Sequence, residues 1–423
     1  MNEINLLDLH DPNIDKSPSS WIEFNGILLD NFLESLIGKI CNSNKISRNK
    51  LAFIISNNIN CHQDNICKRF YKIKGYNWYP IPLIISLIKM SSDSKETIKK
   101  NEDMVNSYIE YIRCGKNYNI LPAVKTLKTE ISSLCGAIVA DGHLSRDFNG
   151  KERITIVDFY ENAIKKCSKW LEASFGIKGR VYKSISVNAW YLFIDSKVIT
   201  RFFNTYFSIP YGKKSYIVKE PNIIKNSNFR LDFAKGVLLM DGSVELDYIV
   251  SFGTVSKELA EDIKEILDDN NYSAKFSFKK SNNCYMVKTN RITLGEAKKW
   301  IEFFGKDTEK GYKLYLLSNI FTLKINSIQE AMTALNILCK KTNSTKIELK
   351  DIINIIINEK EFTKKTLSNK LNVGKTTLYK YLWLLEKSNI IKSRKTKGGP
   401  GLDNFYYYND DIDDWKVPIN VST

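Results

Sequence analysis

The sequence contains no long hydrophobic run. None of its segments reaches the roughly 18 uninterrupted apolar residues that a membrane-spanning helix needs, so no membrane span is predicted. The opening residues, MNEINLLDLHDPNIDKSPSS, also lack the basic and then apolar layout of a secretory signal peptide. We therefore expect a cytoplasmic protein without a membrane partner.

Cysteine and histidine occur in no metal-binding or disulfide pattern. The eight cysteines form no CxxC pair, and the chain has only three histidines. Because zinc sites and disulfide frameworks depend on such spacings, we expect neither of them. The cysteines are interpreted as reduced thiols with structural roles.

Acidic residues are too few to balance the basic ones. The chain has 63 Lys and Arg but only 47 Asp and Glu residues, so its formal net charge is +16. A surplus of this size favours a polyanionic partner, namely nucleic acid in preference to an anionic membrane surface. The length of 423 residues predicts roughly two to four domains.

Two short segments of the chain end in the same way. Residues 134–142 read LCGAIVADG and residues 234–242 read AKGVLLMDG, so each is an apolar helix that ends in Asp-Gly. Asp-Gly alone is a common turn signal. Here, however, Asp141 and Asp241 are 100 residues apart (241 − 141), and similar patterns follow both.

The predicted elements after each Asp-Gly come in the same order. Alternating patterns predict strands, and helical spacings predict the helices between them. The first half contains elements at 153–158, 161–176, 179–187, 189–196 and 196–207, and the second at 248–254, 256–271, 272–280, 284–294 and 295–305. With the apolar helix in front, each half reads as αββαββα. This indicates tandem repeats over residues 122–225 and 226–325.

The flanking regions are predicted to form two further domains. Residues 1–121 carry helical spacing at 47–58, 63–73 and 81–90, which fits a helix-turn-helix and a plain helical bundle equally well. Residues 326–423 predict three helices and a Gly/Pro-rich basic hairpin, as in a winged helix-turn-helix. The whole chain is therefore interpreted as an α+β protein.

The C-terminal domain is strongly basic. Residues 341–400 hold 14 basic and 5 acidic residues, a net charge of +9 (14 − 5), and an acidic tail follows. Its GKTT segment resembles the end of a phosphate-binding loop, but Asn369 occupies a position where that loop needs glycine. We interpret the segment as the start of a recognition helix. The expected DNA contacts are Lys375, Thr376, Thr377 and Lys380, with Arg394 and Lys395 in the hairpin.

Two stripes run along the first apolar helix. An apolar stripe that predicts a buried face consists of Ile131, Leu134, Cys135, Ile138 and Val139. A second stripe of small residues, which lets another helix come close, consists of Ser133, Gly136, Ala137 and Ala140. Gly236 offers similar room in the second helix. Packing through Gly136, Ala140 and Gly236 would bring Asp141 and Asp241 together at the helix tips.

Two adjacent carboxylates at helix C-termini are costly by themselves. They repel each other, and each lies at the negative end of a helix dipole. A divalent cation bound by oxygen ligands relieves this cost. The pair therefore predicts a site for Mg²⁺, or for another divalent ion such as Mn²⁺.

The two segments resemble the signature motifs of the LAGLIDADG homing endonucleases. The resemblance covers residues 122–325 and includes the αββαββα order of both halves. It implies a tandem saddle of two curved sheets that binds DNA, with the metal-binding aspartates at the eighth motif position, here Asp141 and Asp241. The sixth position, often Asp in that family, is Val139 and Leu239, and the second motif is the more divergent.

The resemblance also implies a basic residue near each scissile phosphate. In the first repeat the best match is Lys219, which lies two residues before Pro221. Lys213 and Lys214 are the alternates. In the second repeat Lys306, Lys310 and Lys313 are left open. His143, directly after the first motif, is interpreted as a strand residue.

The solvent faces of the two sheets are expected to lie along the DNA major groove. The residues expected to contact phosphates or bases there are Lys178, Arg180, Tyr182, Lys183, Lys275, Lys279, Lys280 and Lys288. Because one chain carries both repeats, the resemblance implies a monomer that cuts a long, asymmetric double-stranded target.

Three functions compete at this stage. The leading one is a site-specific DNA endonuclease of intron homing, and the alternatives are an RNA maturase that assists intron splicing and a non-catalytic DNA-binding regulator. Both motif aspartates are retained, which speaks against the regulator. Protein splicing is not expected, because the chain begins with Met and ends in VPINVST.

Overall fold

The computed structural model describes residues 4–318 apart from 16, 73–76, 115–118, 149 and 246–247. Beyond 318 it describes residues 352, 355, 358–359, 361–372, 374, 378, 381–382, 385–386, 391–394 and 404–408. The chain divides into two compact units, Met1–Ser243 with Ser251–Asn290 and Val244–Val250 with Arg291–Thr423. It is a mixed α/β protein with antiparallel sheets, as expected from the sequence.

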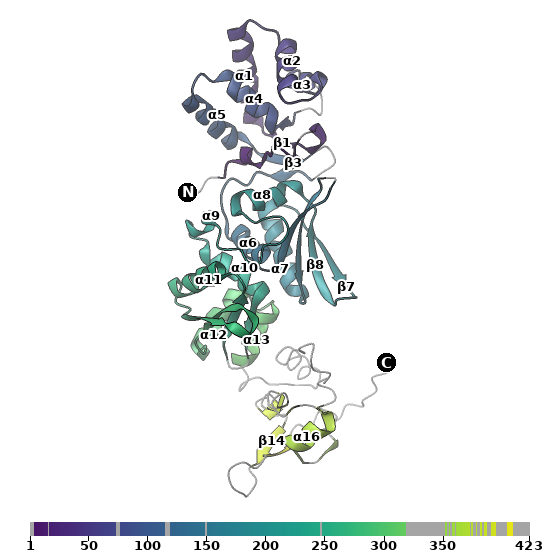
Figure 1. Cartoon of the computed structure of the whole chain (residues 1–423), viewed down its shortest axis with the longest axis vertical. Helices are drawn as coiled ribbons and strands as arrows, with labels where there is room; N and C mark the ends of the chain where they lie inside the picture. The colour runs from purple at the N-terminus through teal and green to yellow at the C-terminus, as the bar shows by residue number, and fades with distance from the viewer. Residues whose placement is uncertain are drawn as a thin grey trace. The chain divides into compact units, whose positions relative to one another are not determined.

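The N-terminal region combines helices with a small sheet (Figure 1). Its α-helices are α1 (Ile27–Asn44), α2 (Arg48–Asn58), α3 (Gln63–Phe70), α4 (Ile81–Ser91) and α5 (Lys95–Tyr108). Its strands are β1 (Ile22–Asn25), β2 (Tyr79–Pro80), β3 (Tyr111–Cys114) and β4 (Leu121–Pro122), in the order β2-β1-β3-β4. The sequence patterns predicted α2, α3 and α4, but not the sheet.

The middle of the chain repeats one order of elements. The first copy is α6 (Thr129–Asp141), β5 (Gly142–Arg146), β6 (Glu152–Asp158), α7 (Glu161–Phe175), β7 (Arg180–Ser184), β8 (Ala189–Ile194) and α8 (Lys197–Phe207). The second is α10 (Arg230–Asp241), β9 (Gly242–Val244), β10 (Val250–Thr254), α11 (Lys257–Asp269), β11 (Ala274–Lys279), β12 (Cys284–Thr289) and α12 (Leu294–Phe304). Short helices α9 (Asn222–Lys225) and α13 (Glu309–Ser318) follow the two copies.

The two sheets of the repeats share a strand order. The first is β5-β6-β8-β7, and the second, read from the same end, is β9-β10-β12-β11. The αββαββα order predicted four strands in each copy, but the sequence patterns gave residue ranges for only three of them. The first strand of each sheet, β5 or β9, received no range, because it begins directly after an Asp-Gly, which commonly marks a turn; His143 alone was interpreted as a strand residue there.

Helix boundaries follow from local capping. Ser256 begins α11 by accepting a hydrogen bond from the backbone of Leu259 at 3.2 Å, and Thr293 forms a capping box with Glu296 at the start of α12. α7 ends at Gly176, whose φ of 70° is the left-handed conformation that glycine adopts at little cost. These signals explain why the boundaries expected from the sequence differ by only a few residues from the observed ones.

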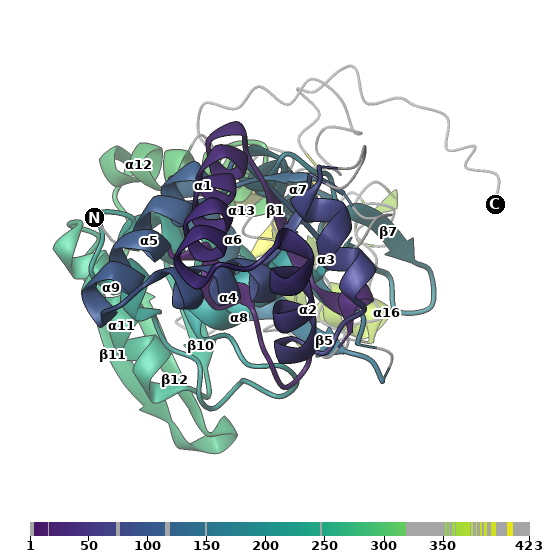
Figure 2. The same ribbon diagram turned by 90° about the horizontal axis from the view of Figure 1, so that it is seen from above.

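The core of the middle region is formed by α6 and α10, which pack against each other (Figure 1). The neighbouring strands β11 and β12 of the second sheet can be followed in Figure 2. All residues of α6 from 131 to 139 are buried, and so are Phe233, Ala234 and residues 236–240 of α10. A helix that is buried on all sides belongs to the centre of a domain. Any group at the ends of these two helices is therefore held on a rigid support.

The described C-terminal residues form α16 (Lys364–Leu371), β13 (Phe362–Thr363), β14 (Ile391–Arg394) and β15 (Phe405–Tyr408), with strand order β13-β15-β14. The predicted recognition helix falls largely outside the described residues. Across the described part of the chain, no helix is long and apolar enough to span a membrane. The seven cysteines in that part are free thiols.

Candidate active site at the tips of two crossing helices

The helices α6 and α10 cross at a pair of glycines. A Cβ atom placed on Gly136 would overlap the carbonyl oxygen of Phe233, and one placed on Gly236 would overlap the carbonyl oxygen of Ser133. The two contacts are related by the same offset of 100 residues, so the helices meet around a pseudo-two-fold axis. Because backbone atoms occupy the space of a side chain at both positions, only glycine fits there.

The Asp-Gly junctions connect each helix directly to a strand. Gly142 and Gly242 have φ values of −86° and −70° with extended ψ, so neither forms the left-handed turn that Asp-Gly commonly indicates. A Cβ on Gly142 would lie 2.5 Å from Cα of Ile138, and one on Gly242 would meet Leu238 in the same way. Glycine is thus needed at both positions, because the backbone there runs close to the last turn of the preceding helix. Asp141 and Asp241, the aspartate pair, remain exposed at the two tips.

Lys214 lies between α8 and α9 and reaches the end of α6. Its Nζ donates hydrogen bonds to the carbonyl oxygens of Val139 and, at 2.8 Å, Ala140, which belong to the last turn of the helix. The residue is only 9% exposed. Burial lowers the pKa of Lys214 to about 8, while the charges of Asp241 and Asp141 act in the opposite direction. The amine is therefore close enough to both members of the aspartate pair to sense their charge.

Lys219, the best match from the sequence, has a different environment. Its side chain is 58% exposed and its Nζ lies 3.8 Å from a carboxylate oxygen of Glu258. The next residue, Glu220, is buried and accepts hydrogen bonds from Arg230 at the start of α10. Lys213 is exposed. Of the three lysines considered for the first repeat, Lys214 is the one that lies at the helix tips.

The candidate lysines of the second repeat differ in burial. Lys310 is 7% exposed at the start of α13. Lys306 is exposed and stacks over the ring of Tyr315 at 3.8 Å, and Lys313 is half-buried. Among described lysines, only Lys197, Lys214 and Lys310 are buried, and Lys197 is neutralised by Asp15 at 2.7 Å.

In the first sheet, the strand pairing places the predicted DNA contacts on two different faces of the sheet. Arg180 and Tyr182 pair with Phe193 and Tyr191, which face away from the helices. Lys183 pairs with Trp190 and lies on the opposite face, where its Nζ is 5.5 Å from the ring. Lys178 lies before β7 and pairs with Glu172 at 3.3 Å. His143 lies in β5 and is exposed, as expected for a strand residue.

The second sheet has a basic open face. Lys275, Lys279 and Lys288 lie on the side opposite the buried Phe252 and Val287. Lys275 and Lys288 are directly paired across β11 and β12. Like charges directly opposite each other destabilise a sheet, so packing within the sheet does not explain this pair. Lys280 follows β11 in a short 3₁₀ helix, Lys280–Asn282.

Only part of the predicted C-terminal interface can be located. Arg394 ends β14, where it pairs with Glu361 at 2.6 Å and lies 5.7 Å from the ring of Phe405. Lys375, Thr376, Thr377, Lys380 and Lys395 lie outside the described residues. Their predicted role in DNA binding remains a prediction.

The donor atoms at the helix tips fit a hard divalent cation. The described residues contain no cluster of three or more His, Cys, Asp and Glu side chains that could hold a metal by themselves. The aspartate pair supplies two exposed carboxylates near one amine, and Mg²⁺ usually takes one or two protein carboxylates together with water and phosphate oxygens. The arrangement therefore suits a metal shared between protein and a phosphate ester.

Sequence reasoning missed a buried ion network that joins the N-terminal residues to the first repeat. Asp15 binds Lys197 and Arg201 of α8, and Arg201 also donates to Glu152 of β6 at 3.0 Å. Burial raises the pKa of Asp15, but hydrogen bonds from His10, Arg201 and Lys197 outweigh it and leave the pKa well below the usual range. No local pattern signals these pairs, because the partners are 49 to 186 residues apart in the chain.

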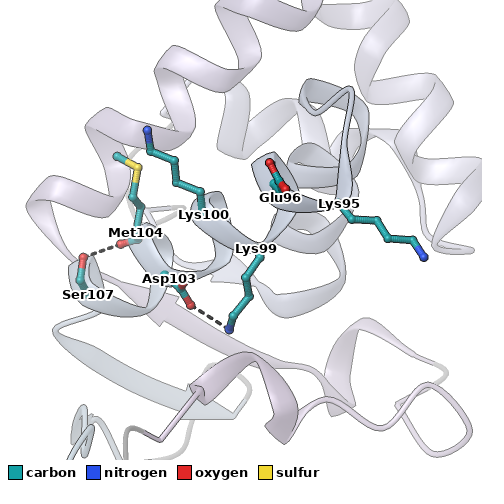
Figure 3. A pocket seen from close by; sticks show the side chains of 7 residues that line it. All are labelled: Lys95, Glu96, Lys99, Lys100, Asp103, Met104 and Ser107. Carbon is teal, nitrogen blue, oxygen red and sulfur yellow. Dashed lines mark hydrogen bonds and ion pairs between the residues drawn. The ribbon is translucent and has the colours of Figure 1, made fainter.

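A depression on the surface of α5 is not part of this site (Figure 3). It is lined by side chains of a single helix, including Lys99, which pairs with Asp103 at 2.9 Å, and Ser107, which donates to the carbonyl of Met104 at 2.7 Å. These are ordinary contacts between exposed residues one helical turn apart. We assign no function to the depression.

Comparisons with known proteins were made for the whole chain. No protein-family model matches it, and no curated protein does. Among solved structures it is similar to mesophilic variants of the homing endonuclease I-DmoI, with a TM-score of 0.32 and 17% identity over 42% of this chain and 95% of that chain. Because the TM-score is below 0.5, we draw nothing further from this similarity.

Two other solved structures show a similarity of the same degree. The I-LtrWI LAGLIDADG homing endonuclease bound to target DNA has a TM-score of 0.33 and 11% identity over 51% of this chain and 98% of that chain. The N-terminal LAGLIDADG domain of DUF199/WhiA has a TM-score of 0.28 and 16% identity over 43% and 86%.

Proposed function

We propose that this protein is a site-specific double-strand DNA endonuclease of the LAGLIDADG type. One observation carries the proposal: two aspartates in matching motifs end two helices that cross at matching glycines, with a buried lysine near both carboxylates. The tandem motifs of the sequence and the two basic or aromatic sheet faces support it.

In this proposal each residue at the helix tips has its own task. Asp141 and Asp241 hold a divalent cation, Mg²⁺ or Mn²⁺, which supplies positive charge for hydrolysis of a phosphodiester. Lys214, fixed by the carbonyls of Val139 and Ala140, places a nitrogen beside the scissile phosphate of the first half-site. For the second half-site Lys306, Lys310 and Lys313 remain the candidates, and Lys310 is the buried one of the three.

The two sheets form the DNA-binding saddle in this proposal. Lys275, Lys279 and Lys288 of the second sheet and Arg180 of the first contact the backbone or the base edges in the major groove. The C-terminal residues 326–423 act as a winged helix-turn-helix that adds phosphate contacts, and residues 1–121 extend the binding surface. The protein works as a monomer on a long asymmetric target.

Cleavage assays on aspartate variants test the proposal. The substrate is a plasmid that carries the genomic sequence flanking the gene, joined as it would be without the insertion. We expect Asp141→Asn and Asp241→Asn each to abolish cleavage in Mg²⁺ and leave duplex binding largely intact, because these carboxylates bind metal and not phosphate. The matched control is Asp103→Asn, an exposed residue of α5. Either tip variant cleaving at the wild-type rate would refute the assignment.

A further inference from the structure

The open face of the first sheet carries a row of aromatic rings. Phe193 and Tyr191 of β8 are stacked with their centroids 5.7 Å apart and an angle of 10° between the rings. Tyr182 of β7 continues the row, 6.5 Å from Tyr191. Tyr182 is 54% exposed, and the other two rings are half-buried. We call these three residues the aromatic row.

Cations flank the aromatic row at its Phe193 end. The guanidinium groups of Arg153 and Arg180 lie 5.2 Å and 5.1 Å from the centroid of the Phe193 ring. Arg153 is paired with Asp195. Among the described residues, no carboxylate lies within ion-pair distance of Arg180. The row therefore combines ring faces with a positive charge that is available to an anion.

The second sheet places its aromatic residues on the other side. Phe276, Phe278 and Tyr285 share the face of the buried Phe252 and Val287, and α11 packs against these strands. The open face of that sheet carries Lys275, Lys279 and Lys288 and, among its described strand residues, no aromatic ring. Two sheets with the same strand order have thus diverged in the chemistry of their open faces, so packing requirements common to both do not explain the aromatic row.

We infer that the aromatic row is a stacking platform for unpaired nucleotide bases, in single-stranded nucleic acid or an RNA loop. Paired bases in a duplex show only their edges in the grooves and have no free ring face to offer. Unpaired bases stack on exposed aromatic side chains of antiparallel sheets, while neighbouring arginines hold the phosphates. In the turn that joins β7 and β8, the apolar side chains of Ile185 and Val187 are also 91% and 54% exposed.

This binding activity is independent of the proposed cleavage. It uses the same sheet face that a duplex would occupy, so duplex DNA and a single strand compete for it. The aspartate pair and Lys214 lie at the helix tips and take no part in stacking.

The test measures binding of fluorescein-labelled oligouridine, oligothymidine and a DNA duplex of equal length to full-length protein without divalent metal. Tyr182→Leu and Tyr191→Leu keep the side chains apolar and the charge unchanged. We expect each to weaken single-strand binding about 5- to 150-fold, the usual effect of losing one stacked base. Tyr191→Leu, which alters none of the predicted duplex contacts, should change duplex binding less than twofold. Phe278→Leu, which removes a partly exposed ring from the other face of the second sheet, should change neither.

The RNA and DNA probes separate the two sources of unpaired bases. Equal losses for both identify stacking alone, and a loss confined to oligouridine adds recognition of the 2′-hydroxyl; either result supports the platform. Unchanged single-strand affinity in folded Tyr182→Leu and Tyr191→Leu, judged by melting temperature, would overturn it. Equal losses of single-strand and duplex affinity in Tyr191→Leu would also overturn it. Asp141→Asn should bind single strands like wild type, so a failed cleavage hypothesis would leave this result unaffected.

Discussion

Gly136 and Gly236 lie at the same helix crossing, and each of them packs against the backbone of the other helix. A Cβ on Gly136 would lie 2.8 Å from the backbone nitrogen of Val237, and a Cβ on Gly236 would lie 2.8 Å from that of Ala137. Each glycine therefore opposes the other helix's backbone, which cannot move aside as a flexible side chain can. The spacing of the two helices, and of the aspartates at their ends, depends on both glycines.

Replacing Gly136 should reduce cleavage more than stability. Gly136→Ala forces the helices apart, and Gly136→Leu forces them further; overpacking of this kind costs about 1–3 kcal/mol of unfolding free energy. A displacement of about 1 Å at a catalytic site can cost on the order of 100-fold in rate. Melting temperature and cleavage rate should be measured on the same sample. The control is Gly38→Ala in α1, where a Cβ meets no atom within 4 Å and stability should rise. A fully active Gly136→Leu protein would refute the crossing.

Lys214 and Lys219 should behave differently when replaced by Met. Lys214→Met removes the buried amine beside the aspartate pair, and we expect cleavage to fall about 100-fold or more, as when a positioned electrostatic group is lost from an active site. Lys219→Met removes an exposed charge and should leave the rate within a fewfold of wild type. The measurement is the single-turnover cleavage rate of each variant. A larger loss of rate in Lys219→Met than in Lys214→Met would identify Lys219 as the functional lysine.

Asp15 should stabilise the protein at neutral pH but less in acid. Its pKa is lower in the folded state, so its contribution to stability is present above the unfolded value of about 4 and is lost as the pH falls through the folded pKa. Asp15→Asn leaves Lys197 and Arg201 buried without this carboxylate, which should cost about 3–5 kcal/mol at pH 7.

The pH dependence of that cost can be measured by urea denaturation of both proteins. Between pH 5 and pH 3 the difference between wild type and Asp15→Asn should shrink by roughly 1 kcal/mol, since one pH unit below the unfolded pKa corresponds to about 1.4 kcal/mol. A difference that stays constant over this range would mean that the pKa of Asp15 is the same in the folded and the unfolded state.

Ser132→Ala should stabilise the protein. The Oγ atom of Ser132 is buried in α6 and lacks a hydrogen-bond partner, which costs about 1–3 kcal/mol. Removing it, with the better helix propensity of alanine, should raise the unfolding free energy by about 1 kcal/mol. Ser256→Ala is the control, because that hydroxyl caps α11 and donates to Val218, so its loss should cost about 1 kcal/mol. A destabilised Ser132→Ala variant would show that the hydroxyl is bonded after all.

The sequence predicted helices and strands best where the apolar pattern of the element repeats several times. The spacing of apolar residues placed α7, α8 and α11 within a few residues, and alternation placed β6, β8 and β12. Strands of two to four residues, such as β2 and β4, are too short to carry a period. Alternation along β7 could also have predicted that Lys183 lies on the opposite face of the sheet from Arg180 and Tyr182, because successive strand residues point to opposite faces.

The choice between Lys214 and Lys219 could not be made from the sequence. Both lie in one loop, and neither periodicity nor composition tells which is buried. The loop folds back so that Gly212 donates to the carbonyl of Leu144 at 2.9 Å, and this tertiary contact brings Lys214 under the helix tips. The buried pair of Asp15 and Lys197 is set by tertiary contacts in the same way.

The 100-residue offset at the helix crossing has a consequence for the history of the chain. An isologous contact, in which each surface meets its own equivalent, is the form that two identical subunits use when they pair. A gene that duplicated and fused would keep this contact inside one polypeptide. Mutations could then accumulate separately in the two halves, except at Gly136 and Gly236, where a change in either copy breaks a contact used by both. Selection would preserve the glycines as a couple while the sheets diverged.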